Sequence, residues 1–370
     1  MKYRILLLAT FGIVAFALAA DADSVLVRGR EKAVVGDLKI EDAKGVIINT
    51  TKDKKKVDEL IPAADVIDIA YDDIKPAELR LAGGAYKIAR DADKEAGDAS
   101  DPAKRKVALS AAITAYNKTL TDMQAHKSAK RTLEYRVAVL MVKQAVNDSL
   151  PTDKALTKLQ AFKTAYPNSW QIVHVMPMIA QLQLDAKDYK GAEQTFQEMS
   201  EMDALPPDVR TAAELEVVQV NVRAGNIAQA QKKLDVLEVK AKGNPAFASR
   251  VKMARAEVLV GQKKNDEAVP ILQQVVKENN DKQIKAMAHN TLGECYFKAT
   301  RYNEALWEFL WVDAVFNQDR GQHARALYYL WKCFEQLNNA ERAQECREML
   351  LNDRQFTGTE YQIRAKSEVK

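Results

Sequence analysis

The sequence predicts a mainly α-helical protein, in which stacked helix pairs form an α-solenoid that follows a small antiparallel β-barrel. Two observations lead to this fold class. The first is a ladder of alanines spaced 37 or 38 residues apart, formed by Ala155, Ala192, Ala230, Ala268, Ala305 and Ala343. The second is a group of short β-branched runs between residues 24 and 73. A fixed period of about this length is typical of solenoids, because each repeat is one helix pair that stacks on its neighbours.

The stretch from residue 290 to residue 309 carries the clearest repeat. Its characteristic residues occur in the order Leu292, Gly293, Tyr296, Ala305 and Phe309. This order resembles the tetratricopeptide repeat, in which L-G-x2-Y is followed by A-x3-F. We expect Gly293 to allow a close approach of two helices, and Ala305 to lie where the second helix crosses the first.

The resemblance extends from about residue 136 to residue 354, with departures from the family pattern. His289 stands where the motif has Trp, Thr300 where a turn glycine is common, and Val312 where Ala is usual. Large apolar residues follow most ladder alanines by four positions, at Leu159, Phe196, Leu234, Leu272 and Phe309, whereas Arg347 breaks this rule in the last repeat. The period exceeds the family's ~34 residues, so we expect the extra residues in loops between repeats. The resemblance implies a right-handed superhelix that binds other proteins.

The first 20 residues have the pattern of a secretory signal peptide. Lys2 and Arg4 precede an apolar run that ends at Ala20, with small residues suited to cleavage near its end. The run is shorter than the ~20 residues a membrane-spanning helix needs, and acidic residues follow it directly. Because no cysteine lies near the cleavage point, we predict a secreted or periplasmic protein and not a lipoprotein. No later segment is apolar enough to predict a membrane span.

Residues 21–75 are predicted to form the small β-barrel. Alternating residues, as in Leu38 to Glu41, indicate strands with one buried face, and polar turns separate the runs. The pattern is similar to SH3-like and Sm-like mini-barrels through Gly36, Gly45, Ile61, Pro62 and Asp65. About 50 residues make a marginal core, so we expect this domain to dock on the first helices.

The remaining chain divides into three parts. Residues 76–126 are predicted to form a junction helix pair, and residues 127–355 the solenoid of tetratricopeptide-like repeats. Residues 356–370 are polar, and we expect this tail to fray.

Charge and cysteine content exclude several function classes. The formal net charge of +4 gives no global field for binding nucleic acid or an anionic membrane. Cys295, Cys333 and Cys346 have no metal-ligand spacing. Cys295 and Cys333 occupy equivalent positions in adjacent repeats, which favours buried thiols. A disulfide between Cys333 and Cys346 is the alternative for an exported protein.

Motifs for catalysis, metal binding or cofactor binding are not found in the sequence. The histidines His126, His174, His289 and His323 lack a partner at the spacing of a metal site. His289 is predicted to pack in a repeat core. There is no nucleophile elbow and no phosphate-binding glycine loop, so we predict a non-catalytic protein without a cofactor.

Two surfaces are candidates for partner binding. If Leu292 occupies its family position, a concave groove is lined by Met287, Asn290, Glu294, Phe297, Arg325, Tyr328 and Lys332; the alternative is an ordinary solvated face. Trp307 and Trp311 form a second candidate, either as an exposed aromatic patch or, in the interpretation that we favour, as core residues between repeats.

These observations predict an exported scaffold or adaptor that joins protein partners, in a bacterial cell-envelope assembly. Two alternatives remain open. In one, the aromatic residues bind cell-wall material or another glycan. In the other, the chain is a structural protein that assembles into a homo-oligomer.

Overall fold

The computed structural model describes residues 22–52, 54–70, 85–99, 101–122, 127–148, 151–203 and 205–368. The predicted signal peptide, His126 and most of the segment that follows the β domain lie outside these ranges. The chain separates into two compact units. One comprises residues 1–186 with 198–210, and the other comprises residues 187–197 with 211–370.

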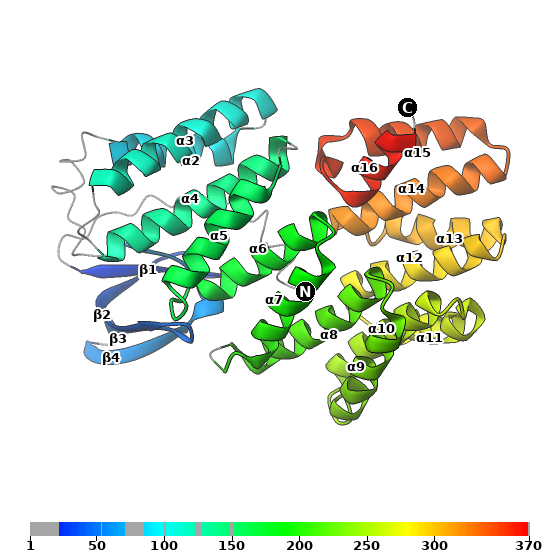
Figure 1. The fold of residues 1–370 in the computed structure, drawn as a ribbon, viewed down its shortest axis with the longest axis horizontal. Coiled ribbons are helices and arrows are strands. Elements are labelled where there is room, and N and C mark those ends of the chain that lie inside the picture. The colour runs from blue at the N-terminus through cyan, green and yellow to red at the C-terminus, as the bar shows by residue number, and fades with distance from the viewer. Residues whose placement is uncertain are drawn as a thin grey trace. The chain divides into compact units, whose positions relative to one another are not determined.

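The N-terminal part of the first unit is a five-stranded antiparallel sheet (Figure 1). Its strands are β1 (Asp23–Val27), β2 (Val34–Asp42), β3 (Gly45–Lys52), β4 (Lys55–Pro62) and β5 (Val66–Ala70). They lie in the order β4-β3-β2-β1-β5, and a 3-10 turn, η2 (Ala63–Asp65), links β4 to β5. Val25, Val46, Ile48 and Val66 are fully buried on the inner face. The alternation from Leu38 to Glu41 is not matched by burial, because Ile40 is 50% exposed.

The predicted closed barrel is not found. Within the described residues, β4 and β5 are the two edges of the sheet and do not pair with each other. The physical reason is that η2, the segment between the two edge strands, is held by a helix of the same unit. His174 Nε2 on α6 (Ile172–Asp185) lies 3.0 Å from the Ala63 carbonyl oxygen and 3.2 Å from that of Val66.

Ion pairs and a histidine fix this docking, which confirms the expectation that the β domain rests on the first helices. Arg136 on α4 (Lys127–Asp148) pairs with Asp68 of β5 and lies 3.8 Å from Asp93 on α2 (Ala85–Asp98). The Nη2 of Arg131 is 2.6 Å from Glu41 Oε1. The third helix residue that contacts the β domain is His174 on α6, whose Nε2 contacts the carbonyl oxygens of Ala63 and Val66.

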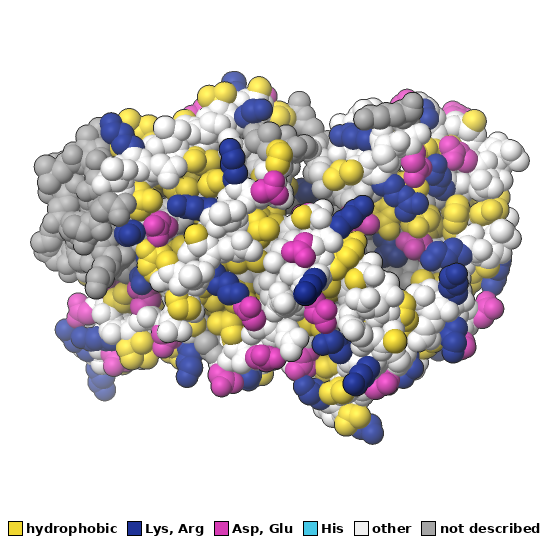
Figure 2. Space-filling model, in the orientation of Figure 1, with side chains coloured by type: hydrophobic (Ala, Val, Ile, Leu, Met, Phe, Trp, Pro, Cys, Tyr) yellow, Lys and Arg dark blue, Asp and Glu magenta, His cyan; other side chains and the backbone are white. Residues whose placement is uncertain are grey.

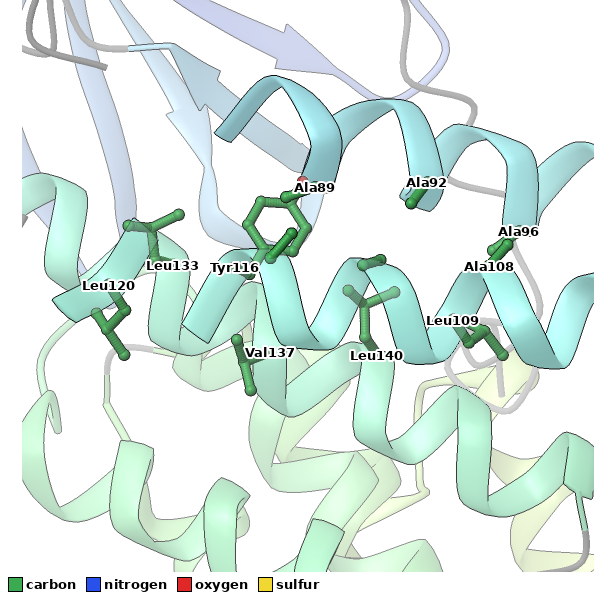
Figure 3. Packing of buried hydrophobic residues seen from close by; sticks show 12 residues of the cluster. Ala89, Ala92, Ala96, Ala108, Leu109, Tyr116, Leu120, Leu133, Val137 and Leu140 are labelled. Carbon is green, nitrogen blue, oxygen red and sulfur yellow. The ribbon is translucent and has the colours of Figure 1, made fainter. Parts of the chain in front are cut away.

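The helices of the junction pack on α4 through small side chains. Helix α3 (Pro102–Asp122) lies against α2 and α4. Figure 3 shows Ala89 and Ala96 of α2 next to Tyr116 and Ala108 of α3, with Leu133, Val137 and Leu140 of α4 in the same cluster. The cluster includes Ala89, Ala92, Ala96, Leu109, Tyr116, Leu133, Val137 and Leu140.

The other helices continue the repeat as pairs. They are α5 (Asp153–Ala165), α7 (Tyr189–Glu201), α8 (Pro207–Arg223), α9 (Ile227–Lys240), α10 (Pro245–Gly261), α11 (Asn265–Glu278), α12 (Lys282–Lys298), α13 (Tyr302–Ala314), α14 (Arg320–Gln336) and α15 (Ala340–Asn352). A 3-10 turn, η3 (Arg354–Phe356), then leads to α16 (Glu360–Glu368), where the sequence predicted a frayed tail. No described helix has the length and apolarity that crossing a membrane requires.

The alanine ladder lies on the second helix of each pair and is buried throughout. Ala155, Ala192, Ala230, Ala268, Ala305 and Ala343 lie on α5, α7, α9, α11, α13 and α15, and all are buried. Gly293 also behaves as predicted: a Cβ added there would lie 2.7 Å from the ring of Phe309. Any side chain at Gly293 would therefore push the two helices of this repeat apart.

The turn inside each repeat requires a left-handed backbone at one position. Positive φ angles recur at Lys187, Gly225, Lys263, Thr300 and Asn338, which keep the 37- or 38-residue spacing of the ladder. The next amide closes the end of the first helix, as in the hydrogen bond from Arg301 N to Tyr296 O at 2.9 Å. Only one of these five positions is glycine, although glycine adopts this conformation at the lowest cost.

We predict that Thr300→Gly stabilises the second unit. Thr300 has φ of 58°, and a β-branched residue is strained there. Removing the strain should raise the free energy of unfolding by about 1 kcal/mol, measured by urea denaturation. Gly225→Ala, at the equivalent turn, is the matched control and should lower it by about 1 kcal/mol. Equal, small effects of both substitutions would contradict this account of the turn.

We also predict that the stability of the first unit falls in mild acid because of His174. Burial lowers the pKa of His174 to about 4, although hydrogen bonds to two carbonyls act in the opposite direction. The unfolded chain binds a proton near the ordinary pKa of 6.5, so acid favours unfolding as the pH falls from 6.5 to 4. This contribution is about 3 kcal/mol. Urea denaturation across this pH range should show a weaker pH dependence in His174→Gln; an unchanged dependence would refute the assignment.

Candidate protein-binding surface

The seven residues of the predicted groove lie on the first helices of the last two repeats, in the second unit. Four are on α12 and three are on α14. Each helix begins at an aspartate whose carboxylate accepts backbone amides of the first turn: Asp281 binds Gln283 N at 2.8 Å, and Asp319 binds Gln322 N at 2.9 Å. These caps fix where the helices start, and therefore which side chains share a face.

Met287 and Asn290 of the predicted groove are not at its surface. Met287 is buried, and Asn290 is fully buried. The Nδ2 of Asn290 donates to both the backbone oxygen and Oε1 of Gln322, at 2.9 Å each. Asn290 therefore joins α12 to α14 and is not available to a partner at the surface.

Glu294 and Arg325 form an ion pair between the same two helices. Arg325 Nε lies 2.6 Å from Glu294 Oε1, and both side chains are mostly buried. Burial works against the charge of Arg325, but the nearby Glu294 carboxylate outweighs it and raises the pKa of the guanidinium. The pair forms the floor of the predicted groove.

Aromatic rings cover this floor. Phe297 and Tyr329 meet edge to face, with ring centroids 5.6 Å apart. Tyr329 also stacks on Phe309, at 5.1 Å. Tyr328 meets Tyr329 at 5.2 Å and is itself buried. The surface thus offers flat rings and, at its rim, the ammonium group of Lys332, which lies 3.8 Å from the ring of Trp331.

Helix α16 lies on this surface. The hydroxyl of Tyr328 donates to Glu368 Oε1 at 2.7 Å, and Lys332 Nζ is 3.0 Å from Glu368 Oε2. The ring of Tyr361 meets the ring of Tyr328 at 5.4 Å, and its hydroxyl is 3.5 Å from Glu294 Oε1. The surface that the sequence predicted as an open groove is therefore occupied by a segment of the same chain.

The contacts of α16 with the surface also change the pKa of the Glu368 carboxyl group on this helix. Burial tends to raise the pKa of Glu368, but hydrogen bonds from Tyr328, Lys332 and Arg364 outweigh this and lower the pKa. The Arg364 guanidinium lies 4.6 Å from the ring of Tyr328. Sequence reasoning missed Tyr361, Arg364 and Glu368. The available signal was their spacing of three, four and seven residues, which places them on one helical side.

The tryptophan pair is exposed, so the favoured core interpretation was wrong. Trp307 is 65% exposed and Trp311 is 50% exposed on α13, and Val315, one turn further, is 40% exposed. Each follows the previous one by four residues, so they form one stripe. The other side of α13 supplies the core through Ala305 and Phe309, and no helix in the described part of the chain buries the stripe.

The packing prediction for His289 is confirmed. His289 is buried, and its ring stacks on those of Trp311 and Phe316, at 6.0 and 5.4 Å. Its Nδ1 lies 2.7 Å from Glu308 Oε2. An imidazole can therefore fill the aromatic position of the motif while its Nδ1 is paired with a carboxylate.

The three cysteines are free thiols, and Cys295 and Cys333 are buried in α12 and α14 as expected. Burial raises the pKa of the Cys295 thiol to about 11 and that of Cys333 to about 12, which disfavours the reactive thiolate. Among the described residues, no cluster of three or more His, Cys, Asp or Glu side chains could hold a metal ion.

With this geometry in view, comparisons with known proteins agree on the fold. Residues 209–319 match the family model of the tetratricopeptide repeat-like domain. The helices form a tetratricopeptide repeat-like solenoid. A tetratricopeptide repeat protein from Parabacteroides merdae ATCC 43184 has a crystal structure that matches with a TM-score of 0.54 at 12% identity, over 79% of this chain and 97% of that chain.

Two other solved structures are more distant. A Rap protein complexed with Competence and Sporulation Factor matches with a TM-score of 0.45 at 11% identity, over 79% of this chain and 77% of that one. BtubC (BKLC) from P. vanneervenii matches with a TM-score of 0.37 at 13% identity, over 62% of this chain and 92% of that one. No curated protein sequence matches the chain significantly.

We predict that Glu294 and Arg325 stabilise the fold only when both are present. Arg325→Leu or Glu294→Leu alone leaves an unpaired buried charge and should lower the free energy of unfolding by about 3 kcal/mol. The double variant Glu294→Leu/Arg325→Leu removes both charges and should recover most of that loss. Urea denaturation of all four proteins measures the coupling. Losses that simply add in the double variant would show that the two groups do not depend on each other.

Proposed function

We propose that this chain is a non-catalytic, exported scaffold that binds protein partners through the aromatic and charged surface of α12 and α14, within a bacterial cell-envelope assembly. Tetratricopeptide repeat-like folds are typical of protein–protein interaction modules. The observation that carries the proposal is that this surface already accepts a peptide helix, α16, through rings, a hydroxyl and an ammonium group.

The export part of the proposal rests on the N-terminal sequence. Lys2 and Arg4 followed by the apolar run to Ala20 are typical of a secretory signal peptide. The distribution of charge supports a role other than nucleic-acid binding. Figure 2 shows Lys and Arg side chains interspersed with Asp and Glu side chains over the face in view, and the formal net charge is +4.

A second candidate is favoured by the exposed stripe on α13. Tryptophan side chains exposed by half or more are energetically costly to leave in water and are enriched where proteins bind partners. The stripe could serve self-association of the scaffold or stacking on a cell-wall glycan. In either case Trp307 and Trp311 would contact the partner, and the surface of α12 and α14 would not take part in binding.

Crosslinking in intact cells, followed by affinity capture and mass spectrometry, tests the two candidates. Wild type is compared with Lys332→Glu, which reverses the charge at the rim of the α14 surface, and Trp307→Ser on the exposed stripe. Lys277→Glu, on the exposed side of α11, is the matched charge control. We expect protein partners with wild type, Trp307→Ser and Lys277→Glu, and an at least tenfold reduced yield with Lys332→Glu.

The other outcomes reject parts of the proposal. Partners lost only with Trp307→Ser would move the site to α13 and support the second candidate. Capture of this chain alone would support self-association, and no crosslinked protein would reject the scaffold. Fractionation of the same cells tests export: full-length protein retained in the cytoplasm contradicts it.

A further inference from the structure

The side of α16 that faces α14 has a simple chemistry. Tyr361, Ala365 and Glu368 follow at intervals of four and three residues, so they share one face of the helix. Tyr361 meets the rings of Tyr328 and Tyr329, and Glu368 binds Tyr328 and Lys332. On the opposite side, Ile363 is 59% exposed. The helix thus presents an aromatic ring, a small residue and a carboxylate to the solenoid.

Helix α16 buries fewer residues than α12 and α14, the first helices of the last two repeats. In α12, twelve residues are buried, including Ile284, Leu292 and Tyr296. In α16, only Gln362 and Ala365 are buried. Burial of apolar side chains is the main source of helix attachment, so α16 belongs to the elements that open most easily.

The chain before α16 is anchored independently. Phe356 is fully buried, and its ring meets that of His323 edge to face at 5.0 Å. Arg320 Nη2 donates to the Thr357 oxygen at 3.1 Å. Gly358 follows directly, with φ of 76°. Gln362 adds two bonds that α16 would have to break to open: its Oε1 accepts from Gly358 N at 3.1 Å, and its Nε2 donates to Leu351 O at 3.1 Å. Rotation at the glycine would then release α16 while the anchor keeps α15 in place.

We propose that α16 is a displaceable self-ligand, and that the protein partner of the α12–α14 surface carries a helical segment of the same chemistry: an aromatic residue, a small residue four positions later and a carboxylate seven positions later. The inference rests on the proposed function. It adds the chemistry by which the partner helix is recognised and the way in which its binding is regulated. Lys332 and the hydroxyl of Tyr328 would bind the partner's carboxylate, and the rings of Tyr328 and Tyr329 would pack on its aromatic residue.

Because α16 is tethered to the α12–α14 surface, its contact with that surface regulates the binding of a partner helix. A segment joined to its site by a few residues has an effective concentration in the millimolar range, so a weak contact keeps the site filled. A partner helix must then bind more tightly than the tethered one to replace it. Weakening α16 should raise the apparent affinity of any external helix, because the fraction of open sites rises.

The test uses a fluorescent peptide of residues 358–368, titrated onto full-length proteins and followed by anisotropy. The receptors are wild type, Tyr361→Ala, and Ile363→Ala as the matched control on the exposed side. We expect Tyr361→Ala to bind the peptide at least about tenfold more tightly than wild type and Ile363→Ala. Adding Lys332→Glu to Tyr361→Ala, or Glu368→Gln to the peptide, should remove most of this binding.

Amide hydrogen exchange provides a second measurement that does not depend on peptide affinity. In Tyr361→Ala, exchange should accelerate over residues 360–368 and stay at the wild-type rate in α15. Full-length Glu368→Gln should give the same pattern. Acceleration throughout α14 and α15 would mean that α16 is an integral part of the last repeat, and would overturn the proposal.

Two further outcomes would overturn it. One is the absence of peptide binding to Tyr361→Ala, and the other is equal affinity for wild type and Tyr361→Ala. A concentration-dependent dimer that Tyr361→Ala abolishes would make the occupant a second copy's α16, in place of another protein. Partners captured through Lys332 without peptide binding would leave the proposed function standing and reject this inference alone; peptide binding without captured partners would do the reverse.

Discussion

The structure depends on one small buried residue, an alanine, at the same place on the second helix of each repeat. Six such alanines, from Ala155 to Ala343, are buried, and at the clearest repeat the ring of Phe309 lies directly on Gly293. Larger residues at these points would separate the helices and open voids that close-packed interiors do not tolerate. Because the contact recurs, the turn recurs as well, and so does the left-handed residue that closes each first helix. The alanine ladder and the turn ladder are two results of the same geometry.

Polar side chains join neighbouring repeats. This pairing decides which polar side chains remain available to a ligand. Asn290 and Glu294 are on the face that would carry a ligand, but they bind Gln322 and Arg325 of the next repeat. A buried amide or carboxylate must be paired, and the adjacent first helix is the nearest source of partners. The same need fixes the β sheet in the first unit, where Arg136 pairs with Asp68 and His174 binds two backbone carbonyls. Residues that look like binding groups in the sequence thus hold the scaffold together.

The binding surface is built above this paired layer. Tyrosine rings supply contact area at low entropic cost, and a tyrosine hydroxyl with an ammonium group recognises a carboxylate. Helix α16 shows that this combination accepts a helix, which connects the fold to the proposed scaffold role. Its few buried residues make the helix replaceable, whereas the anchor at Phe356 keeps it near the site. The exposed tryptophans on α13 belong to a different surface, which can serve a second contact without competing with the first.

The sequence by itself determined the local structure: the helix pairs, the alanine contacts, the β-branched N-terminal strands, the packed His289 and the buried Cys295 and Cys333. These depend on residues close in the chain or on a repeating period, which a single sequence displays. Only the tertiary structure decided that the sheet stays open, that Asn290 is interior, that Trp307 and Trp311 are exposed, and that α16 fills the predicted groove. Each of these depends on which distant surface covers a given face. Tyr328 and Glu368, which are 40 residues apart, show the reason. The period of the sequence shows which side chains share one face of a helix. It does not show which other part of the molecule that face contacts.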